Sequence, residues 1–390
     1  MNQGKFVFAQ LFEYVNRYEF DKCVDRYQGD YKTRDFSCWS QFLYMAFGQF
    51  THRESCTDII TCLNAQRNSV YHLGLKQIVA VSTLTRANEN RDWRIYSDFA
   101  NYLLSITRPL YRDDNDFSLD LDNTVYAFDS TTIDLCLSAF VWAKFRKAKA
   151  AVKLHTLIDL RGNLPTFIYI SDGKLHDVNA LDELMSEENA FYVMDRAYID
   201  YSRLYRMTLA LSYFVVRAKD NLKFRVVESR EVVKTLGLKC DQTIRLKIKK
   251  SAKDYPAYLR RVKFYDKENK RMLVFLSNNF EISALLIAQL YKQRWQVELF
   301  FKWIKLHLRI KVFWGYSPNA LKTQVWIAVC TYILVAYIKK QLKVELSLYE
   351  MVQILSVSVF SKVPLNELFT NMSKNENNNE SCNQLTLFDL

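Results

Sequence analysis

The sequence predicts an α/β protein in which a mixed sheet flanked by helices follows a helical N-terminal region. Helical periodicity dominates the first hundred or so residues, whereas apolar strand-like segments alternate with helical ones beyond residue 120. The 390 residues suffice for two or three domains, and 49% hydrophobic with 25% charged residues is typical of globular proteins. Only eight Gly and five Pro are present, so regular elements should outweigh loops.

Four helices are expected in the N-terminal region. An amphipathic stripe is formed by Trp39, Leu43, Phe47 and Phe50, and Thr51-x-x-Glu54 has the pattern of a capping box that opens a helix toward Asn64. Further helices are predicted near 82–88 and from Asp92 to about Leu104. Ser, Thr, Arg and Asn near an exposed helix start suit a helix-turn-helix-like DNA reader, and an ordinary helical bundle fits equally well.

Strands and helices should alternate after the acidic loop 111–122. The expected strands are 125–129, 151–160, 164–170, 190–195 and 213–217, with helices at 178–188 and 201–211. Three antiparallel strands followed by alternating helices and strands is the order of a ribonuclease-H-like fold. In that order the first and fourth strands lie side by side.

Positive charge is concentrated in one segment. The net charge is +12, and residues 217–271 hold 18 Lys and Arg against 7 Asp and Glu, a balance of +11. Within it Thr243–Lys249 alternates, which predicts antiparallel strands with Ile244, Leu246 and Ile248 toward a core and Arg245, Lys247 and Lys249 outward. Such a row suits a nucleic-acid backbone, with a solubilising surface as the alternative.

Two aspartates end apolar strands. Asp129 follows Val125–Phe128, and Asp195 follows Phe191–Met194. A carboxylate against a hydrophobic strand is costly unless positive charge meets it, and a divalent metal ion would supply that charge. The strand order predicts that the two aspartates converge.

A third candidate acid lies on a predicted helix. If 291–305 is one helix, Tyr291, Arg294, Glu298 and Lys305 share one narrow face, while Val297, Phe300, Ile304 and Leu308 face a core. A carboxylate flanked by Arg and Lys suits a metal ion beside a phosphate. Paired charges on a solvated face would explain the Glu and Lys but not the Tyr, Arg and Trp.

The spacing Tyr291-x2-Arg294-x3-Glu298-x6-Lys305 resembles the signature of the insertion-sequence-four family of DDE transposases. The resemblance covers roughly residues 30–340. It implies that Asp129, Asp195 and Glu298 are catalytic and bind two Mg²⁺ or Mn²⁺ ions. It further implies that Tyr291, Arg294 and Lys305 hold DNA phosphates. Trp295 would stack on a displaced base, or else belong to the core.

By the same resemblance, the expected activity is cut-and-paste DNA transposition through metal-dependent phosphodiester hydrolysis and strand transfer at terminal inverted repeats. Double-stranded transposon ends and target DNA would be the partners, with a homodimer assembled on DNA in the bacterial cytoplasm, at the nucleoid. The segment 82–91 resembles the N-terminal domain of one family branch, which implies DNA contacts by Arg86 and Arg91. A nuclease without strand transfer and a DNA-binding regulator with structural acids are the alternatives.

The predicted domains are a DNA-binding region (1–110), a catalytic domain (118–221 and 283–342), a basic insertion (222–282), a helical region (343–370) and a flexible tail (371–390). The apolar segment 325–338 is too short to span a membrane and should be a buried helix, so no membrane is expected. The tail ends in an apolar island that resembles a motif for the replication sliding clamp and that otherwise packs on its own domain. It comprises Gln384, Leu385, Leu387 and Phe388.

Overall fold

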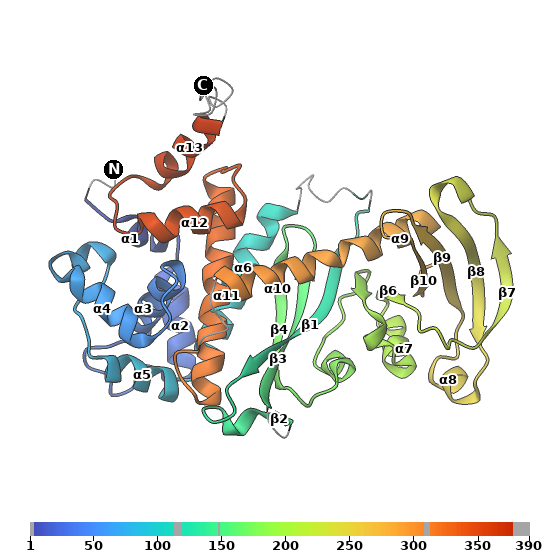
Figure 1. Cartoon of the computed structure of the whole chain (residues 1–390), viewed down its shortest axis with the longest axis horizontal. Coiled ribbons are helices and arrows are strands. Elements are labelled where there is room, and N and C mark those ends of the chain that lie inside the picture. The colour runs from blue at the N-terminus through green and yellow to red at the C-terminus, as the bar shows by residue number, and fades with distance from the viewer. Residues whose placement is uncertain (1–3, 113–118, 120, 147–148, 308–312, 377–390) are drawn as a thin grey trace, which may run out of the picture. The chain divides into compact units, whose positions relative to one another are not determined.

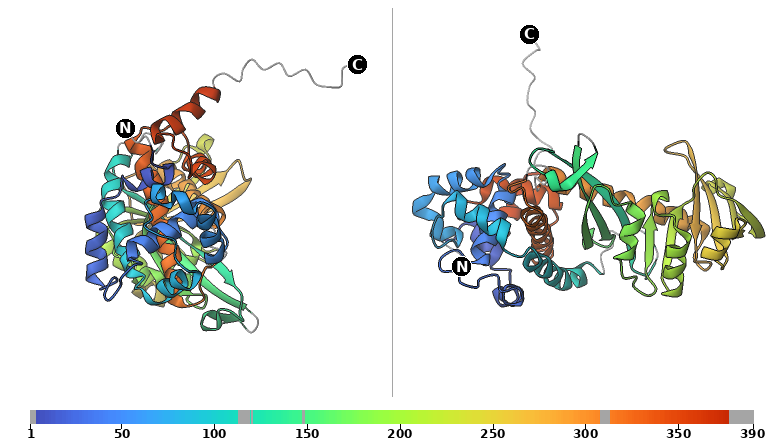
Figure 2. Two further views of the ribbon diagram at one scale, coloured as in Figure 1. Left: turned by 90° about the vertical axis from the view of Figure 1, so that its left-hand side faces the viewer. Right: turned by 90° about the horizontal axis from the view of Figure 1, so that it is seen from below.

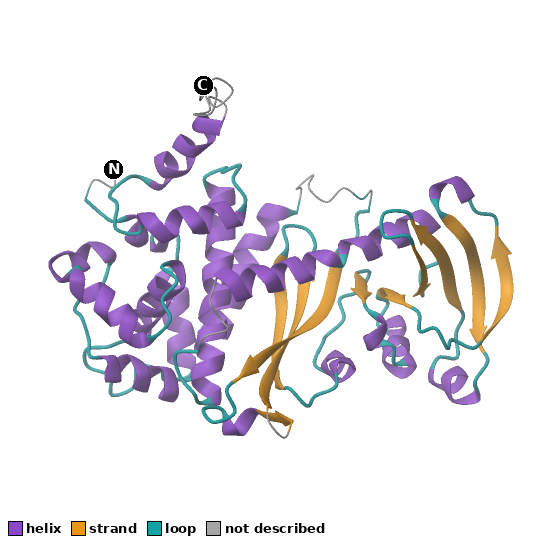
Figure 3. Ribbon diagram, in the orientation of Figure 1, coloured by secondary structure: helices purple, strands orange, loops and turns teal. Residues whose placement is uncertain are grey.

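The structure, a computed structural model, describes residues 4–112, 119, 121–146, 149–307 and 313–376 (Figure 1). The chain divides into two compact units: Met1–Leu110 with Trp303–Leu390, and Tyr111–Lys302. The described strands, orange in Figure 3, all fall within the residues of the second unit. The functional division into DNA-binding, catalytic, insertion and tail regions stays a prediction.

The first unit is helical and joins segments from both ends of the sequence, drawn in blue to cyan and in orange to red in Figure 2. The 3₁₀ turns Arg67–Leu73 and Arg108–Tyr111 follow two of its helices. Its α-helices are α1 (Val7–Phe12), α2 (Arg17–Arg26), α3 (Cys38–Phe50), α4 (Cys56–Ala65), α5 (Val81–Asn90), α6 (Arg94–Thr107), α11 (Pro318–Gln341), α12 (Leu348–Ser358) and α13 (Leu365–Glu376).

Helix α11 is the core of this unit and packs on α3, α5, α6 and α12. Among the described residues it is the one helix long and apolar enough to cross a membrane, and 89% of its most apolar window is buried inside the protein. Its apolar character is therefore accounted for by burial on all sides. The expectation that 325–338 is part of a buried helix is confirmed.

The four expected N-terminal helices are present, with one wrong cap. Ser55, not Thr51, caps α4, because the Ser55 hydroxyl accepts a hydrogen bond from the Asp58 backbone N–H at 3.0 Å. The Thr51 hydroxyl instead donates to the Phe47 carbonyl at 2.7 Å, at the end of α3. Two possible cap residues four positions apart misled the sequence-based assignment.

The second unit is built on one ten-stranded sheet. Its strands are β1 (Val125–Leu135), β2 (Lys144–Arg146), β3 (Lys149–Asp159), β4 (Leu164–Asp172), β5 (Phe191–Met194), β6 (Tyr213–Arg217), β7 (Phe224–Arg230), β8 (Leu238–Leu246), β9 (Leu259–Asp266) and β10 (Arg271–Ser277). Its helices are α7 (Tyr201–Leu209), α8 (Lys249–Asp254), α9 (Ala284–Gln293) and α10 (Trp295–His307), of which the residues from Trp303 onward are assigned to the first unit.

The sheet has the predicted ribonuclease-H-like order β4–β3–β1–β5–β6. Strands β1, β3 and β4 are antiparallel neighbours, whereas β1, β5 and β6 run parallel. The helix expected at 178–188 is wrong, because only the short 3₁₀ turn Asp177–Asp182 forms there. The other short 3₁₀ turns of this unit are Val141–Ala143, Arg196–Tyr198 and Lys234–Leu236.

The basic segment extends this same sheet. Strand β10 pairs antiparallel with β6, and β9, β8 and β7 follow in order. The alternation in β8 is confirmed for Ile244 and Leu246, which are buried, and for Arg245, which is exposed. It fails beyond the strand: Ile248 is exposed, and Lys249 begins α8, because β8 ends at Leu246.

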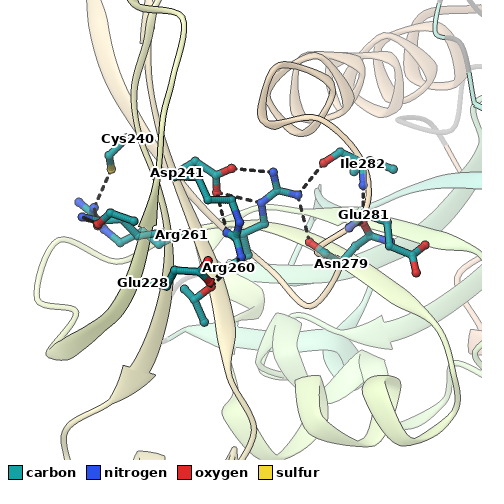
Figure 4. A network of polar contacts seen from close by, with 12 residues as sticks. Glu228, Cys240, Asp241, Arg260, Arg261, Asn279, Glu281 and Ile282 are labelled. Atoms are coloured by element: carbon teal, nitrogen blue, oxygen red, sulfur yellow. Dashed lines mark hydrogen bonds and ion pairs between the residues drawn. The ribbon is translucent and has the colours of Figure 1, made fainter.

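A buried arginine ties these strands to the loop before α9 (Figure 4). Arg260 of β9 forms a two-pronged ion pair with Asp241 of β8, with Nε–Oδ1 at 2.9 Å and Nη2–Oδ2 at 2.8 Å. Its third nitrogen donates to the Ile282 carbonyl at 2.6 Å. In the same loop the Asn279 side chain accepts hydrogen bonds from the backbone N–H groups of Glu281 and Ile282. The loop before α9 is therefore held both by Arg260 and by its own Asn279.

Candidate functional site

The two predicted aspartates are neighbours across two strands. The parallel pairing of β1 with β5 ends at Phe128 and Met194, and Asp129 and Asp195 are the next residue on each chain segment. The expected adjacency of these strands is confirmed by this register. The strand end predicted at Asp129 is wrong, since β1 continues to Leu135 while it stays paired with β3.

The two faces of β1 have different surroundings. Tyr126 and Phe128 belong to an apolar core shared with Tyr192 and Met194 of β5. Because side chains alternate along a strand, Asp129 points to the opposite face. That face is also the one from which the segment between α9 and α10 reaches the sheet, as the contacts of Asp129 show.

The predicted single helix 291–305 is interrupted at Arg294, where α9 ends and α10 begins. The Arg294 N–H bonds the Tyr291 carbonyl at 3.2 Å, and the Val297 N–H bonds the Arg294 carbonyl at 3.1 Å, so both are tighter i to i+3 turns. Arg294 itself keeps helical backbone angles (φ −53°, ψ −26°). The break is therefore a local tightening that leaves Tyr291, Arg294 and Glu298 on one side.

Five predicted site residues are joined by direct contacts. The Arg294 guanidinium donates through Nη1 to Asp129 Oδ2 and through Nη2 to Glu298 Oε1, each at 2.5 Å. The Tyr291 hydroxyl donates to Asp195 Oδ1 at 3.1 Å. Two strands and the α9–α10 segment thus bring three acids, separated by 66 and 103 residues in sequence, into one constellation.

The ring of Tyr291 packs against β10, one of the strands of the basic segment. It contacts Phe275, with the ring centroids 4.7 Å apart. Burial raises the pKa of the Tyr291 hydroxyl to about 12, and the nearby Asp195 carboxylate adds to that rise. The hydroxyl therefore stays protonated and serves as a hydrogen-bond donor to Asp195 at neutral pH.

The three acids share one electrostatic environment. Burial raises the pKa of Asp129 to about 6; Arg294 opposes the rise, whereas Glu298 and Asp195 add to it. Burial by itself would lower the pKa of Arg294, but the surrounding Asp129, Tyr291 and Glu298 raise it above its usual value. Across the described residues no three Asp, Glu, His or Cys side chains stand close enough to hold a metal ion, and here the guanidinium lies between two of the acids.

A polar network missed by the sequence reasoning lies behind Asp129. Asp177 Oδ1 accepts from the Ser130 hydroxyl at 2.9 Å and from Lys153 Nζ at 3.0 Å. The Ser130 backbone N–H in turn donates to Asp129 Oδ1 at 2.8 Å. Pairing of β1 with β3 places Lys153 opposite Thr132, two residues after Ser130. This register could have indicated that Lys153 lies near Ser130, because it follows once β1 and β3 are aligned.

A groove of about 940 Å³ adjoins the constellation within the second unit. It runs between α9, the start of α10 and the β9–β10 hairpin, and Tyr291, Arg294 and Trp295 form part of its wall. Trp295 is 57% exposed, so the alternative that places it in the core is wrong. Lys267, Arg271 and Lys292 also line this groove, together with Asp266 and Glu268, which pair with Arg271 and Lys292, respectively.

The remaining predicted DNA-contacting residues are scattered. Arg245 and Lys247 are exposed on and just after β8, and Lys249 is exposed at the start of α8. Lys305 lies on α10 in the part that belongs to the first unit. The sliding-clamp segment at 384–388 lies outside the described residues.

Arg86 and Arg91 differ in their environments. Arg86 is exposed on α5. Arg91 is largely enclosed: its guanidinium donates to the Gln41 side chain at 3.1 Å and to the Phe36 carbonyl, and it lies 3.8 Å from Asp30. Of the two, Arg86 has its side chain presented to solvent.

Comparison with known proteins gives a consistent picture. The family described as "Transposase DDE domain" matches residues 120–334, and a "Domain of unknown function (DUF4372)" matches residues 3–76. A probable transposase for insertion sequence element IS5377 of Geobacillus stearothermophilus is 31% identical over 60% of this chain and 63% of that protein. The putative transposase y4zB of Sinorhizobium fredii is 34% identical over 50% and 55%, respectively.

More distant similarity is also found. A putative transposase for insertion sequence element IS4SA of Synechocystis is 25% identical over 69% of this chain and 75% of that protein. A solved piggyBac transposase synaptic complex with hairpin DNA aligns at 12% identity with a TM-score of 0.44, over 97% of this chain and 86% of that one. The chain thus spans less than two thirds of the first two curated relatives named above.

The match to the transposase domain covers more than half of the chain. It includes β1 with Asp129, β5 with the following Asp195, and the α9–α10 segment with Tyr291, Arg294 and Glu298. The residues that the structure joins are therefore those of the matched domain, and the chain belongs to the transposase DDE domain family.

Proposed function

We propose that this chain catalyses cut-and-paste movement of an insertion sequence, with Asp129, Asp195 and Glu298 holding two Mg²⁺ or Mn²⁺ ions. The observation that carries the proposal is the convergence of these acids around Arg294 and Tyr291. Members of the family generally use divalent metal ions. The choice of Mg²⁺ or Mn²⁺ rests on the oxygen-only donor set.

The donor types of Asp129, Asp195 and Glu298 fit such ions, and holding one would require these described side chains to come closer together than they stand without metal. Three carboxylates supply hard oxygen ligands, which both ions prefer. One guanidinium offers a single positive charge against three negative ones, so further positive charge would be favourable. Asp129, whose side chain is 19% exposed, already depends on such compensation because burial opposes its ionisation.

When bound, the ions would activate a water molecule or a 3′-hydroxyl group and stabilise the leaving oxygen. The protein's own part is positional. The Ser130 N–H occupies one oxygen of Asp129, and the other oxygen meets the α9–α10 segment. Tyr291 fixes Asp195 from the same segment. Together these contacts orient the acids before a phosphodiester enters.

Exposed cations support a path for DNA. The groove beside the acids carries Lys267, Arg271 and Lys292, and its exposed Trp295 offers a flat surface to an unpaired base. Arg245 and Lys247 add positive charge on β8, for contacts to the phosphate backbone. Tyr291, Arg294 and Lys305 would approach the phosphates nearest the scissile bond.

We further propose the remaining assignments as parts of this function. The region 1–110 would bind the transposon ends, with DNA contacts by the exposed Arg86 and, if its internal contacts were released, by Arg91. Two copies would act together on DNA in the bacterial cytoplasm, at the nucleoid. The segment 384–388 would contact the sliding clamp. Pull-down of the clamp by the wild-type chain but not by a Leu387→Ala, Phe388→Ala variant tests this contact, and equal capture by both would refute it.

The test of the main proposal is cleavage of DNA that carries the inverted repeats flanking the protein's own gene. Wild type should cut at the repeat ends only with Mg²⁺ or Mn²⁺ and should join the freed 3′ ends to a target plasmid. Glu298→Gln should bind the same DNA without cutting it. Cutting without joining would reduce the protein to a nuclease. Binding without any cutting by wild type would favour a regulator.

A further inference from the structure

Arg294 is bonded to two of the acids that the proposed function assigns to metal ions. Its two terminal nitrogens each meet one carboxylate oxygen at 2.5 Å, Asp129 Oδ2 on one side and Glu298 Oε1 on the other. The guanidinium side chain is only 16% exposed. A planar guanidinium has its N–H donors in fixed directions, so a group that bridges two carboxylates in this way constrains their separation and orientation.

The same contacts place Arg294 where it would oppose an incoming cation. Asp129 Oδ1 already accepts the Ser130 N–H, and Arg294 holds the other oxygen, Oδ2. A divalent ion held by Asp129 and Glu298 would compete with the guanidinium for the same carboxylates. Two positive groups that bind the same carboxylates repel each other strongly in a partly buried site.

The charge count leads to the same conclusion. Asp129, Asp195 and Glu298 contribute three negative charges, and Arg294 contributes one positive charge. Asp195 is held by a neutral hydroxyl, that of Tyr291, so it gains no compensating charge from this contact. The constellation thus retains an excess of two negative charges, which a divalent ion would balance if the guanidinium gave way.

We propose that Arg294 is a positioning residue that acts as an internal counter-ion: its guanidinium holds Asp129 and Glu298 in register and is displaced from them when a divalent cation binds. This inference rests on the proposed function, because it takes the three acids to be the metal site. It differs from a role in phosphate contact alone, since it predicts competition between arginine and metal in the protein without DNA.

Manganese binding to the full, DNA-free chain tests the competition. Free Mn²⁺ is followed by its paramagnetic resonance signal during titration of wild type, Arg294→Lys and Arg294→Met. Arg294→Met should bind Mn²⁺ about tenfold more tightly than wild type, within the range usual for coupling between two binding events. Arg294→Lys should fall between them, because one ammonium group does not span both carboxylates. Arg206→Met, which removes an exposed arginine of α7 paired with Asp182, is the matched control and should equal wild type.

Thermal unfolding gives a second readout that does not depend on activity. Without metal, Arg294→Met should unfold at a lower temperature than wild type, because its acids have lost their counter-ion. Millimolar Mn²⁺ should raise its melting temperature by more than it raises that of wild type. If Arg294→Met does not fold without metal, the comparison of Arg294→Lys with wild type decides. Weaker or equal Mn²⁺ binding by the variants would overturn the proposal.

Failure of the inference is distinguishable from failure of the proposed function. If Asp129→Asn binds Mn²⁺ as well as wild type does, or if neither wild type nor Arg294→Met binds any, the acids are not a metal site and both ideas fall. If Asp129→Asn loses binding but the Arg294 variants gain none, only the counter-ion role is refuted.

Discussion

Two arginines of the second unit differ in how they bind carboxylates: Arg260 binds one carboxylate with two nitrogens, whereas Arg294 bridges two carboxylates. Arg260 and Asp241 form a closed pair in which the side chains are 4% and 5% exposed, and the remaining guanidinium nitrogen bonds a backbone carbonyl. Arg294 instead divides its terminal nitrogens between Asp129 and Glu298, and its buried Nε has no hydrogen-bond partner. Glu298 remains 37% exposed.

The difference separates structural from functional charge burial. In the Arg260 pair each donor and acceptor is matched inside the protein, and the nearby Arg230, 3.4 Å from Asp241, adds positive charge. In the Arg294 constellation negative charge exceeds positive and one side is open to solvent. A closed, balanced pair fixes a loop, whereas an open, unbalanced one is suited to an external ligand.

The largest expected effect is on catalysis. Asp195→Asn removes the charge of an acid but keeps its shape and its hydrogen bond with Tyr291. Cleavage at the inverted repeats should fall by about a thousandfold or more, the scale seen when one member of a catalytic group is lost. Single-turnover cleavage rates measure this, with circular dichroism as the control for folding. A loss below tenfold would show that Asp195 is not catalytic.

Changes to the buried Arg260–Asp241 pair should affect the stability of the fold instead of catalysis. Arg260→Met leaves Asp241 buried with a weaker partner, so the free energy of unfolding should fall by about 3–5 kcal/mol. Replacing both partners, as Arg260→Met with Asp241→Leu, should recover much of that loss because no buried charge remains. Urea denaturation of the single and double variants measures both values. Equal destabilisation by the single and double variants would contradict the interpretation.

The open constellation should also give a pH signature. The pKa of Asp129 is about 6 against an ordinary 3.8. Between these values the folded protein binds a proton that the unfolded chain has lost. This stabilising contribution is complete below pH 4 and vanishes as pH rises through 6. It amounts to roughly 2–3 kcal/mol.

Comparison of wild type with Asp129→Asn isolates this contribution. With EDTA present, the change in unfolding free energy between pH 4 and pH 7 should be more positive for the variant by that amount. His155, whose pKa burial lowers to about 4, destabilises both proteins as pH falls below 6.5 and so cancels. Identical pH dependence in the two proteins would rule out the raised pKa.

The smallest effect is expected for a solvent-exposed ion pair. Lys292 and Glu268 are 2.8 Å apart, and their side chains are 70% and 69% exposed. Lys292→Ala should change the free energy of unfolding by less than about 0.5 kcal/mol, because water already solvates both charges. Urea denaturation against wild type suffices. If Lys292→Ala lowered the free energy of unfolding by more than about 2 kcal/mol, solvent exposure would not explain the difference between this ion pair and the Arg260–Asp241 pair.

Sequence patterns captured the parts of the fold with strong periodicity. The strand order that joins Asp129 to Asp195 follows from apolar segments of suitable length, and the buried side of α10 was expected for Val297 and Phe300. The convergence of Glu298 with these acids was given by family resemblance. Local patterns alone contain no information on that long-range approach.

Other features depend on tertiary contacts. The helix break at Arg294 has neither Gly nor Pro to mark it, and the strand β8 stops before Ile248 although the alternation continues. The Arg260–Asp241 pair arises from the register of two strands that no local pattern sets. Such features are decided by which segments meet, not by the segments themselves.

The continuity of β6 with β10 constrains how this protein can be shortened. Removing residues 222–282 would strip β6 of its antiparallel neighbour and leave its backbone N–H and C=O groups unpaired along a sheet margin. A truncated chain would then tend to aggregate or exchange strands with a second copy. The basic strands would therefore protect the solubility of the ribonuclease-H-like sheet, whatever they contribute to DNA contacts.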